Sequence, residues 1–268
     1  MLDNKIGFIG AGNIAGAIFN GITSSGYIKP QNIYVFDVDS QKATTFSEKG
    51  ATVVSDLKDI SVNCNFIFLT VKPQIYEQVL LDLKNKVPKD VCFIDVAAGI
   101  SINFVKSVLG YDAPVVRVMP NTPLMYGNGA TALVKCEPVT DEQFLFVKGC
   151  FDSSGVTCVV DEEYINTVIA ISGSAPAYVM RFAKSLINFG IQNGLSKEDS
   201  EKLVLQTLIG SAKMINDSDL SVTDLIRMVT SPNGTTERGL FSLDENNFDS
   251  ILEECLTETV NRAKELSR

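Results

Sequence analysis

The sequence predicts an α/β protein: an N-terminal domain with a mainly parallel sheet, followed by an all-helical C-terminal domain. Two observations support this prediction. Short apolar runs alternate with helical segments through the first 160 residues, and after Asp161 the strand-like runs stop while helical periodicity takes over. Alternation of this kind is typical of a parallel sheet with helices on both faces. We therefore expect a boundary between domains 1–160 and 161–268.

Eight apolar runs in the first domain are expected to be strands, because each is short and bounded by turn residues. The run at 66–71 is of the kind found in parallel strands that are buried on both faces. The expected strands are residues 6–9, 33–36, 51–54, 66–71, 91–98, 115–119, 130–136 and 156–160.

The helices carry recognisable start signals. Pro73 suits the first position of a helix, after which residues 75, 79, 83 and 87, all apolar, share one face. Ser101 is an expected helix cap, and Thr140 with Gln143 forms a capping-box pattern. The second domain is expected to contain helices at 162–171, 177–193, 197–216 and 249–266.

Composition excludes several classes of function. The 268 residues carry a net charge of −9, which disfavours an extended phosphate-binding surface, so no nucleic-acid partner is expected. The chain has no histidine, so histidine triads and HExxH zinc sites are excluded, and no metal site is predicted. Its six cysteines form no CxxC pair and are interpreted as reduced, buried thiols of a cytoplasmic protein. The uncharged stretch 6–28 contains six glycines, which makes it poor membrane material, so no membrane association is expected.

A glycine-rich turn between the first expected strand and helix is the first chemical signal. Residues 7–17 read GFIGAGNIAGA, in which Gly10, Gly12 and Ala15 match G-x-G-x-x-G/A. Gly10 permits a tight turn, and Gly12 has no Cβ to keep backbone N–H groups from a pyrophosphate. Ala15 lets the helix pack closely on the strand. In this strand–turn–helix setting, the motif predicts a Rossmann-type dinucleotide-binding domain.

Asp37 ends the second expected strand. A carboxylate at this position would bind the ribose 2′-hydroxyl of NAD and repel the 2′-phosphate of NADP. The nearest basic residue is Lys42, on the following helix. The sequence therefore predicts that NADH is accepted at least as well as NADPH. The alternative is that Asp37 only caps the next helix.

Four further segments carry a family resemblance. They read TVKP at 70–73, RVMPNTP at 117–123, ISGSAPAY at 171–178 and VTSPNGTTERGL at 229–240. Together with the glycine turn, they resemble pyrroline-5-carboxylate reductase, and SPNGTT is the most specific of them. The resemblance extends from Ile6 to about Leu243. It implies a Rossmann-type domain, a helical dimerisation domain, and self-association as a homodimer or a larger ring.

The resemblance also implies an activity and a set of site residues. A hydride would pass from NADPH or NADH to the cyclic imine L-1-pyrroline-5-carboxylate, giving L-proline in the last step of proline biosynthesis. Besides Asp37, the residues implied to bind the cofactor are Gly10, Ala11, Gly12, Asn13, Ile14, Val71, Lys72, Pro73, Ala97, Ala98 and Asn121. Those implied to bind the substrate are Glu162, Ser231, Gly234, Thr235 and Thr236.

The residues themselves support part of this assignment. The cofactor supplies the hydride, so the protein must mainly align the reactants and hold a carboxylate. A loop at the start of a helix, as at 231–236, can offer free N–H groups and hydroxyls to that carboxylate. Because the chain has no histidine, a hydroxyl or a bound water must relay a proton to the imine nitrogen, and Thr236 is the predicted catalytic residue.

Three segments depart from the family pattern. Asp37-Val38 stands where the family often has Asn-Arg, which puts the usual NADPH preference in doubt. Ala175 replaces a glycine of SGSGPAY, and Asn233 replaces the first glycine of SPGGTT. Asparagine tolerates a left-handed backbone better than most residues, so that turn is expected to survive.

Two alternative functions remain open at this stage. A related imine reductase or β-hydroxyacid dehydrogenase would share the two-domain plan, but the dehydrogenase needs a catalytic lysine early in the second domain. Lys184 is the only nearby candidate, and no active-site motif surrounds it. A non-catalytic nucleotide-binding paralogue is expected to lose the hydroxyls of SPNGTT, whereas this chain retains them.

Overall fold

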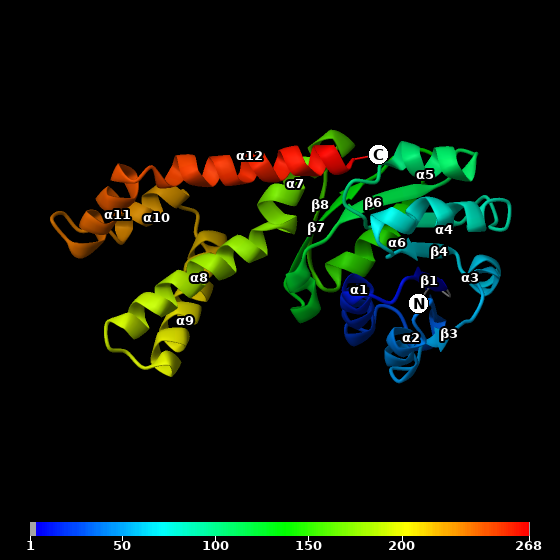
Figure 1. Cartoon of the computed structure of the whole chain (residues 1–268), viewed down its shortest axis with the longest axis horizontal. Coiled ribbons are helices and arrows are strands. Elements are labelled where there is room, and N and C mark those ends of the chain that lie inside the picture. The colour runs from blue at the N-terminus through cyan, green and yellow to red at the C-terminus, as the bar shows by residue number, and fades with distance from the viewer. Residues whose placement is uncertain (1–3, 268) are drawn as a thin grey trace. The chain divides into compact units, whose positions relative to one another are not determined.

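The structure is a computed structural model that describes residues 4–267. It forms two compact units (Figure 1). The first contains the residues up to Ser174 together with those from Thr259 onward, and the second is Ala175–Glu258. The last helix therefore starts in the second unit and returns its C-terminal end to the first.

The first unit is built on a single eight-stranded sheet with the order β3-β2-β1-β4-β5-β6-β7-β8. Every neighbouring pair is parallel except β6 and β7, which are antiparallel, so the predicted mainly parallel sheet is confirmed. The strands are β1 (Ile6–Ile9), β2 (Ile33–Phe36), β3 (Thr52–Val53), β4 (Phe66–Leu69), β5 (Cys92–Asp95), β6 (Val115–Met119), β7 (Gly129–Val134) and β8 (Gly155–Val159).

Helices cover both faces of this sheet (Figure 1). Apolar side chains of α1 (Asn13–Ser24), α2 (Ser40–Ser47) and α6 (Asp141–Asp152) form one core cluster with the strands. Those of α3 (Leu57–Asn63), α4 (Tyr76–Leu83) and α5 (Ile102–Leu109) form a second cluster. This three-layer arrangement explains the continuous apolar runs of β1 and β4, because both faces of these strands are buried.

Two predicted helix starts are confirmed by hydrogen bonds. The Ser101 hydroxyl accepts the N–H of Phe104 at the start of α5. Thr140 and Gln143 form the full capping box of α6, with side-chain to backbone bonds of 3.1 and 3.0 Å. Local hydrogen bonding set both starts, which is why the sequence revealed them.

The structure differs from the sequence prediction around Pro73. A 3₁₀ turn at Pro73–Ile75 precedes α4. The fully buried residues of α4 are Tyr76, Leu80 and Leu83, whereas Ile75 is half exposed. Of the predicted face, Leu83 is therefore buried as expected, and Val79 and Val87 pack partly buried against the second core cluster. The short helix α3, which the sequence pattern did not reveal, lies just before β4 and is capped by Asp56.

The cysteine prediction holds only in part. All six cysteines are free, and Cys64, Cys92 and Cys150 are buried, where burial raises the pKa of the Cys64 and Cys92 thiols to about 12. Cys158 was expected to be buried but is exposed. It lies on β8, which ends the sheet and leaves three of its five residues exposed.

The first compact unit extends beyond the expected boundary at residues 160 and 161. After β8 the chain continues through a 3₁₀ turn, α7 (Ile165–Val168) and a π-helical turn at Ile169–Gly173. Ile165 and Ile169 pack into the second core cluster, so this segment is part of the hydrophobic core of the first unit. The sheet itself ends at Val159, close to the end of the proposed domain 1–160.

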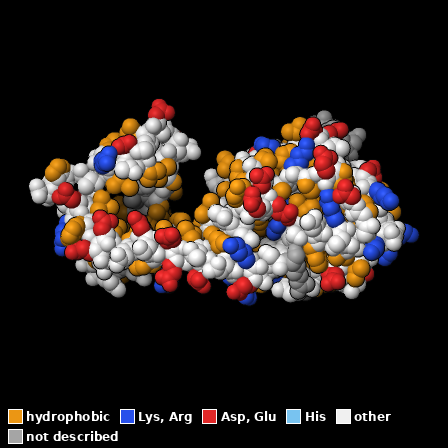
Figure 2. Space-filling model, turned by 90° about the horizontal axis from the view of Figure 1, so that it is seen from above, with side chains coloured by type: hydrophobic (Ala, Val, Ile, Leu, Met, Phe, Trp, Pro, Cys, Tyr) orange, Lys and Arg blue, Asp and Glu red, His pale blue; other side chains and the backbone are white. Residues whose placement is uncertain are grey.

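The second unit is wholly helical. It contains α8 (Ala175–Gln192), α9 (Lys197–Asp217), α10 (Val222–Met228), α11 (Thr235–Glu245) and the start of α12 (Phe248–Leu266). Many of its large apolar side chains are exposed, among them Met180, Phe189 and Ile209, and hydrophobic side chains gather on this unit in Figure 2. Across residues 4–267, no helix is long and apolar enough to cross a membrane.

Candidate cofactor cleft and substrate loop

A cleft lies at the carboxyl edge of the sheet, where β1, β2 and β4 end side by side. Ligands of open α/β sheets bind at this edge, in the crevice where the strand order reverses. The cleft has a volume of about 300 Å³. It is lined by Ile9, Gly10, Gly12, Phe36, Asp37, Val38, Lys42, Thr70, Val71, Lys72, Ile75 and Val79.

The two predicted glycines contribute to this cleft for different reasons. Gly10 has a φ of +103°, and a Cβ there would lie 2.8 Å from the backbone of Thr70. Gly12 has an ordinary φ, and a Cβ there would meet no atom within 4 Å. Gly10 is thus required by the turn, whereas Gly12 leaves open the space directly before α1.

The N-terminus of α1 fits an anionic ligand. Gly12 caps the helix without any side-chain hydrogen bond, and the first turn has no acidic residue. The first N–H groups of a helix lack intrahelical partners and carry a partial positive charge. Together with the open space at Gly12, this turn can accept the pyrophosphate of a dinucleotide.

Asp37 is held firmly at the cleft wall. Its Oδ2 accepts the N–H of Ala11 at 2.6 Å, and its Oδ1 accepts the N–H of Asp39 at 2.8 Å. Capping of α2 falls instead to Asp39, which accepts N–H groups of Gln41 and Lys42. Asp37 therefore joins the glycine turn to the end of β2 and faces the cleft with a fixed carboxylate.

Thr70 is a cleft residue that the sequence analysis did not select. Its hydroxyl is buried and lies 2.7 Å from the carbonyl oxygen of Gly10 and 3.0 Å from that of Ile9. Its backbone N–H also donates to the carbonyl of Ile9. A threonine inside the otherwise apolar run 66–71 was the available signal; it directly follows β4, and strand ends in such sheets adjoin the ligand site.

The remaining predicted cofactor residues do not line this cleft. Pro73 opens the 3₁₀ turn after β4, and Ala97 and Ala98 follow β5. Ala11 is buried and Asn13 is exposed, whereas Ile14 packs partly buried against the first core cluster. The Asn121 amide oxygen accepts the N–H of Ala130 at 2.9 Å, and its nitrogen lies 3.4 Å from the backbone and hydroxyl oxygens of Ser172.

Glu162, predicted on the substrate side, is one-third exposed and already engaged. Its Oε1 accepts the N–H of Ile102 at 2.9 Å and lies 2.8 Å from a guanidinium nitrogen of Arg117. This oxygen therefore accepts a hydrogen bond from the first residue of α5. A role of Glu162 towards substrate stays a prediction.

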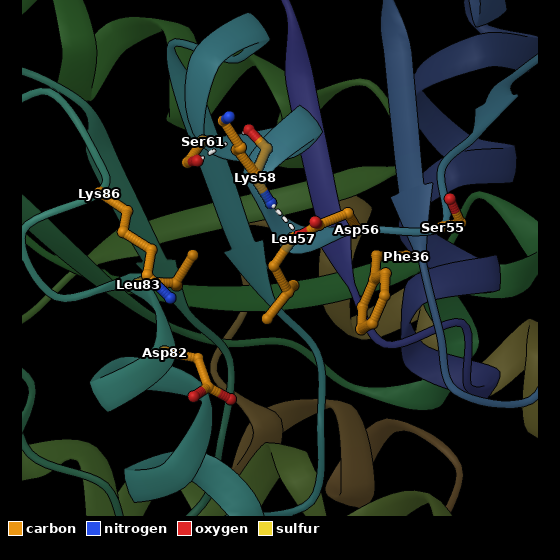
Figure 3. Close-up of a pocket in the computed structure, with 9 residues that line it drawn as sticks. All are labelled: Phe36, Ser55, Asp56, Leu57, Lys58, Ser61, Asp82, Leu83 and Lys86. Carbon is orange, nitrogen blue, oxygen red and sulfur yellow. Dashed lines mark hydrogen bonds between the residues drawn. The ribbon is translucent and has the colours of Figure 1, made fainter.

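A second hollow, of about 340 Å³, adjoins the cleft, with Phe36 lining both (Figure 3). Phe36 and Leu57 form one wall in this view, with Leu83 and Lys86 opposite. Two of its polar residues make hydrogen bonds within α3 and its cap: Asp56 accepts the N–H of Lys58, and the Ser61 hydroxyl donates to the carbonyl of Lys58. No sequence motif pointed to this hollow.

The SPNGTT segment forms a helix start in the second unit. Asn233 has a φ of +57°, so asparagine accommodates the left-handed turn as expected. Gly234 caps α11 without a side-chain hydrogen bond, and the exposed Thr235 and Thr236 occupy the first turn. The N–H of Asn233 donates to the Glu237 carboxylate at 2.8 Å, a contact that the sequence analysis did not anticipate.

Comparison with known proteins agrees with this arrangement. Residues 162–266 match the family model described as pyrroline-5-carboxylate reductase dimerisation, and residues 5–99 match one described as NADP oxidoreductase coenzyme F420-dependent. The pyrroline-5-carboxylate reductase of Staphylococcus aureus is 34% identical over 265 residues, covering 98% of each chain.

Two solved structures extend the similarity to the fold. The pyrroline-5-carboxylate reductase of Coxiella burnetii is 34% identical with a TM-score of 0.92, and that of Plasmodium falciparum, solved with NADP bound, is 31% identical with a TM-score of 0.92. Both comparisons cover 100% of each chain. With identity at this level over its full length, the chain belongs to the pyrroline-5-carboxylate reductase family.

Proposed function

We propose that this chain reduces L-1-pyrroline-5-carboxylate to L-proline with NAD(P)H, as the last step of proline biosynthesis. The full-length match to reductases of this name carries the proposal. The cleft at the carboxyl edge of the sheet supports it, because its glycine turn and helix terminus suit a dinucleotide.

The chain's own residues would bind and orient the cofactor. Residues 10–14 would hold the pyrophosphate through backbone N–H groups, with Val71 and Lys72 along the cleft wall. Pro73, Ala97, Ala98 and Asn121 would complete the surface towards the nicotinamide. When bound, a reduced nicotinamide supplies the hydride, so the protein's contribution is orientation and exclusion of water.

The SPNGTT loop would bind the substrate. Ser231, Gly234 and Thr235 would hold its carboxylate, since uncapped N–H groups and hydroxyls gather at the start of α11. The Thr236 hydroxyl would relay a proton to the imine nitrogen. Glu162 would contribute through its second carboxylate oxygen, because Oε1 is engaged by Arg117 and Ile102.

A direct assay tests this proposal. Purified protein is incubated with L-1-pyrroline-5-carboxylate and either NADH or NADPH, and both cofactor oxidation and proline formation are followed. Proline formed in step with cofactor oxidation is the expected result. Cofactor oxidation without proline, or no turnover with either cofactor, would overturn the proposal.

NADH is proposed to be accepted at least as well as NADPH. Asp37 faces the cleft with a fixed carboxylate. The Lys42 ammonium lies 3.1 Å from the carboxylate of Asp39, so Asp39 partly neutralises the positive charge of Lys42. A carboxylate here attracts the ribose hydroxyl and repels a 2′-phosphate. Asp37→Ser is expected to raise kcat/KM for NADPH about tenfold relative to NADH. A preference of about a hundredfold for NADPH in the unmodified protein would contradict the proposal.

The chain carries a dimerisation domain, and we propose a homodimer or a ring of dimers as its working form. Exposed apolar side chains on α8 and α9 support this, since contiguous apolar surface of this kind favours association. Its place of work is proposed to be the cytoplasm, which the six free thiols support.

A further inference from the structure

The loop between β5 and α5, residues 96–101, has no regular secondary structure but includes Ala97 and Ala98, two proposed cofactor residues. Gly99 bends it with a φ of +81°, and a Cβ at Gly99 would lie 2.5 Å from the carbonyl oxygen of Leu266. Because the loop has no helix or strand hydrogen bonds of its own, groups outside residues 96–101 must hold its backbone in place.

Two carboxylates hold the two ends of this loop. The N–H of Ala97 donates to Asp95 Oδ1 at 3.0 Å, and the N–H of Ile102 donates to Glu162 Oε1 at 2.9 Å. Asp95 is completely buried. Burying an ionised carboxylate is costly unless hydrogen bonds or opposite charge compensate it, so its presence at this position needs a reason.

Arg117 on β6 lies between these two carboxylates. Its NH1 is 2.8 Å from Glu162 Oε1, and its Nε is 3.9 Å from Asp95 Oδ2. Arg117 is only 5% exposed, and neither its Nε nor Asp95 Oδ2 has a hydrogen-bond partner, so these two atoms interact only as an ion pair. The two anchors of the loop thus share one buried guanidinium.

Tyr76 on α4 links the same carboxylate to the neighbouring strand. Its buried hydroxyl lies 2.7 Å from Asp95 Oδ1 and 2.7 Å from the carbonyl oxygen of Leu69. Leu69 ends β4 immediately before Thr70, whose hydroxyl contacts the glycine turn. The hydrogen-bonded chain therefore runs from the glycine turn through β4 to the loop after β5.

We propose that Tyr76, Asp95 and Arg117 are positioning residues that fix the backbone of loop 96–101 relative to the end of β4. The cofactor would then bind to a surface whose conformation is already set before binding. None of the three lines the cleft, so each acts through the backbone that it holds. The inference rests on the proposed function, because that is what assigns Ala97 and Ala98 to the cofactor.

Exchange and binding measurements on two variants of one residue test this proposal. Asp95→Ala removes the acceptor of the Ala97 N–H, whereas Asp95→Asn keeps an oxygen in its place. Hydrogen exchange of the peptide spanning 96–102 is measured without cofactor, with β2 as internal reference, and NADPH affinity is measured from the fluorescence of the bound dihydronicotinamide.

Asp95→Ala is expected to accelerate exchange in 96–102 by at least about tenfold and to weaken NADPH binding by about tenfold, with β2 unchanged. KM for the cofactor should rise while kcat changes by less than about twofold. Asp95→Asn should stay within about threefold of the unmodified protein in both measurements.

Unchanged exchange in Asp95→Ala would overturn the proposal, and so would faster exchange with unchanged NADPH affinity. Failure of the unmodified protein to reduce the imine would instead refute the proposed function, since the exchange measurement needs no substrate. If Asp95→Ala does not fold, Tyr76→Phe replaces it, because only a hydroxyl is removed. Tyr76→Phe is expected to change exchange and affinity by about threefold to fivefold, and no change would overturn the proposal.

Discussion

The two compact units of this chain bury their apolar side chains to very different extents. In the first unit, helices on both faces of the sheet enclose two core clusters. In residues 175–258, all of which the structure describes, the buried residues are only Ala183, Ser200 and Leu225. The sheet unit completes its core within one chain, whereas the helical unit leaves large apolar side chains exposed, and we propose that self-association covers them. Four predictions test this difference.

Self-association should respond most strongly to changes in the helical unit. Met180 on α8 and Ile209 on α9 are 63% and 62% exposed. Replacing both with glutamate should raise the dimer dissociation constant by at least about a thousandfold, because two apolar contacts become buried charges. Analytical ultracentrifugation measures this constant. Leu145→Glu is the matched control on α6, where the side chain is 64% exposed. Equal weakening by the control would erase the distinction between the two units.

Stability of the sheet unit should depend on Asp95 and on pH. Desolvation raises the pKa of Asp95 from an ordinary 3.8 to about 6, although Tyr76 and Arg117 oppose the shift. Because the folded state then binds the proton more tightly, the contribution of Asp95 to the free energy of unfolding is expected to fall as pH rises from about 4 to about 6 and to stay constant above that.

Asp95→Asn removes that dependence. The difference in free energy of unfolding between Asp95→Asn and the unmodified protein should therefore shift in favour of the variant as pH rises from about 4 to about 7. The expected shift is up to about 3 kcal/mol, which is about a hundredfold in the unfolding equilibrium constant. Urea denaturation at several pH values measures it. Parallel stability curves for the two proteins would contradict this expectation.

Substitutions at two glycines, one at the cap of α1 and one inside the helix, should affect cofactor binding and protein stability differently. Gly12→Ala meets no atom in the fold but places a methyl group before the helix terminus, so NADPH affinity should fall about thirtyfold with little change in Tm. Gly16→Ala, inside α1 and equally unobstructed, should leave affinity unchanged and stabilise the protein by about 1 kcal/mol. Titration calorimetry and thermal melts distinguish the two, and similar behaviour of the pair would argue against a cofactor at this turn.

The helical unit should contribute a smaller, chemical effect through Thr236. Thr236→Ala is expected to lower kcat about tenfold through loss of the hydroxyl that assists proton transfer. Thr236→Ser keeps the hydroxyl and should retain most of the activity. Steady-state kinetics with saturating cofactor measures both. Wild-type kcat in Thr236→Ala would exclude Thr236 from the proton relay.

The parts of the fold that the sequence revealed are those that local interactions decide. The caps at Ser101 and Thr140 follow from side chains that bond to backbone three residues away. Of the apolar face predicted after Pro73, Leu83 is buried, and Val79 and Val87 pack partly buried against the second core cluster. Ile75 departs from the prediction, because it lies in the 3₁₀ turn that precedes α4 and is half exposed. Cys158 was expected to be buried but is exposed, because β8 is the edge strand of the sheet. The local sequence pattern does not reveal the order of strands in a sheet.

The same distinction applies to the candidate site. The sequence by itself determined the glycine turn, the acidic end of β2, the SPNGTT segment and, through them, the family. Only the tertiary structure brought Tyr76, Asp95, Arg117 and Glu162 together, because β4, β5 and β6 lie side by side and the chain after β8 returns to them. A motif can be recognised in the sequence because backbone geometry constrains residues that are neighbours in the chain. The buried charge cluster cannot, because it depends on contacts between residues 19 to 45 positions apart.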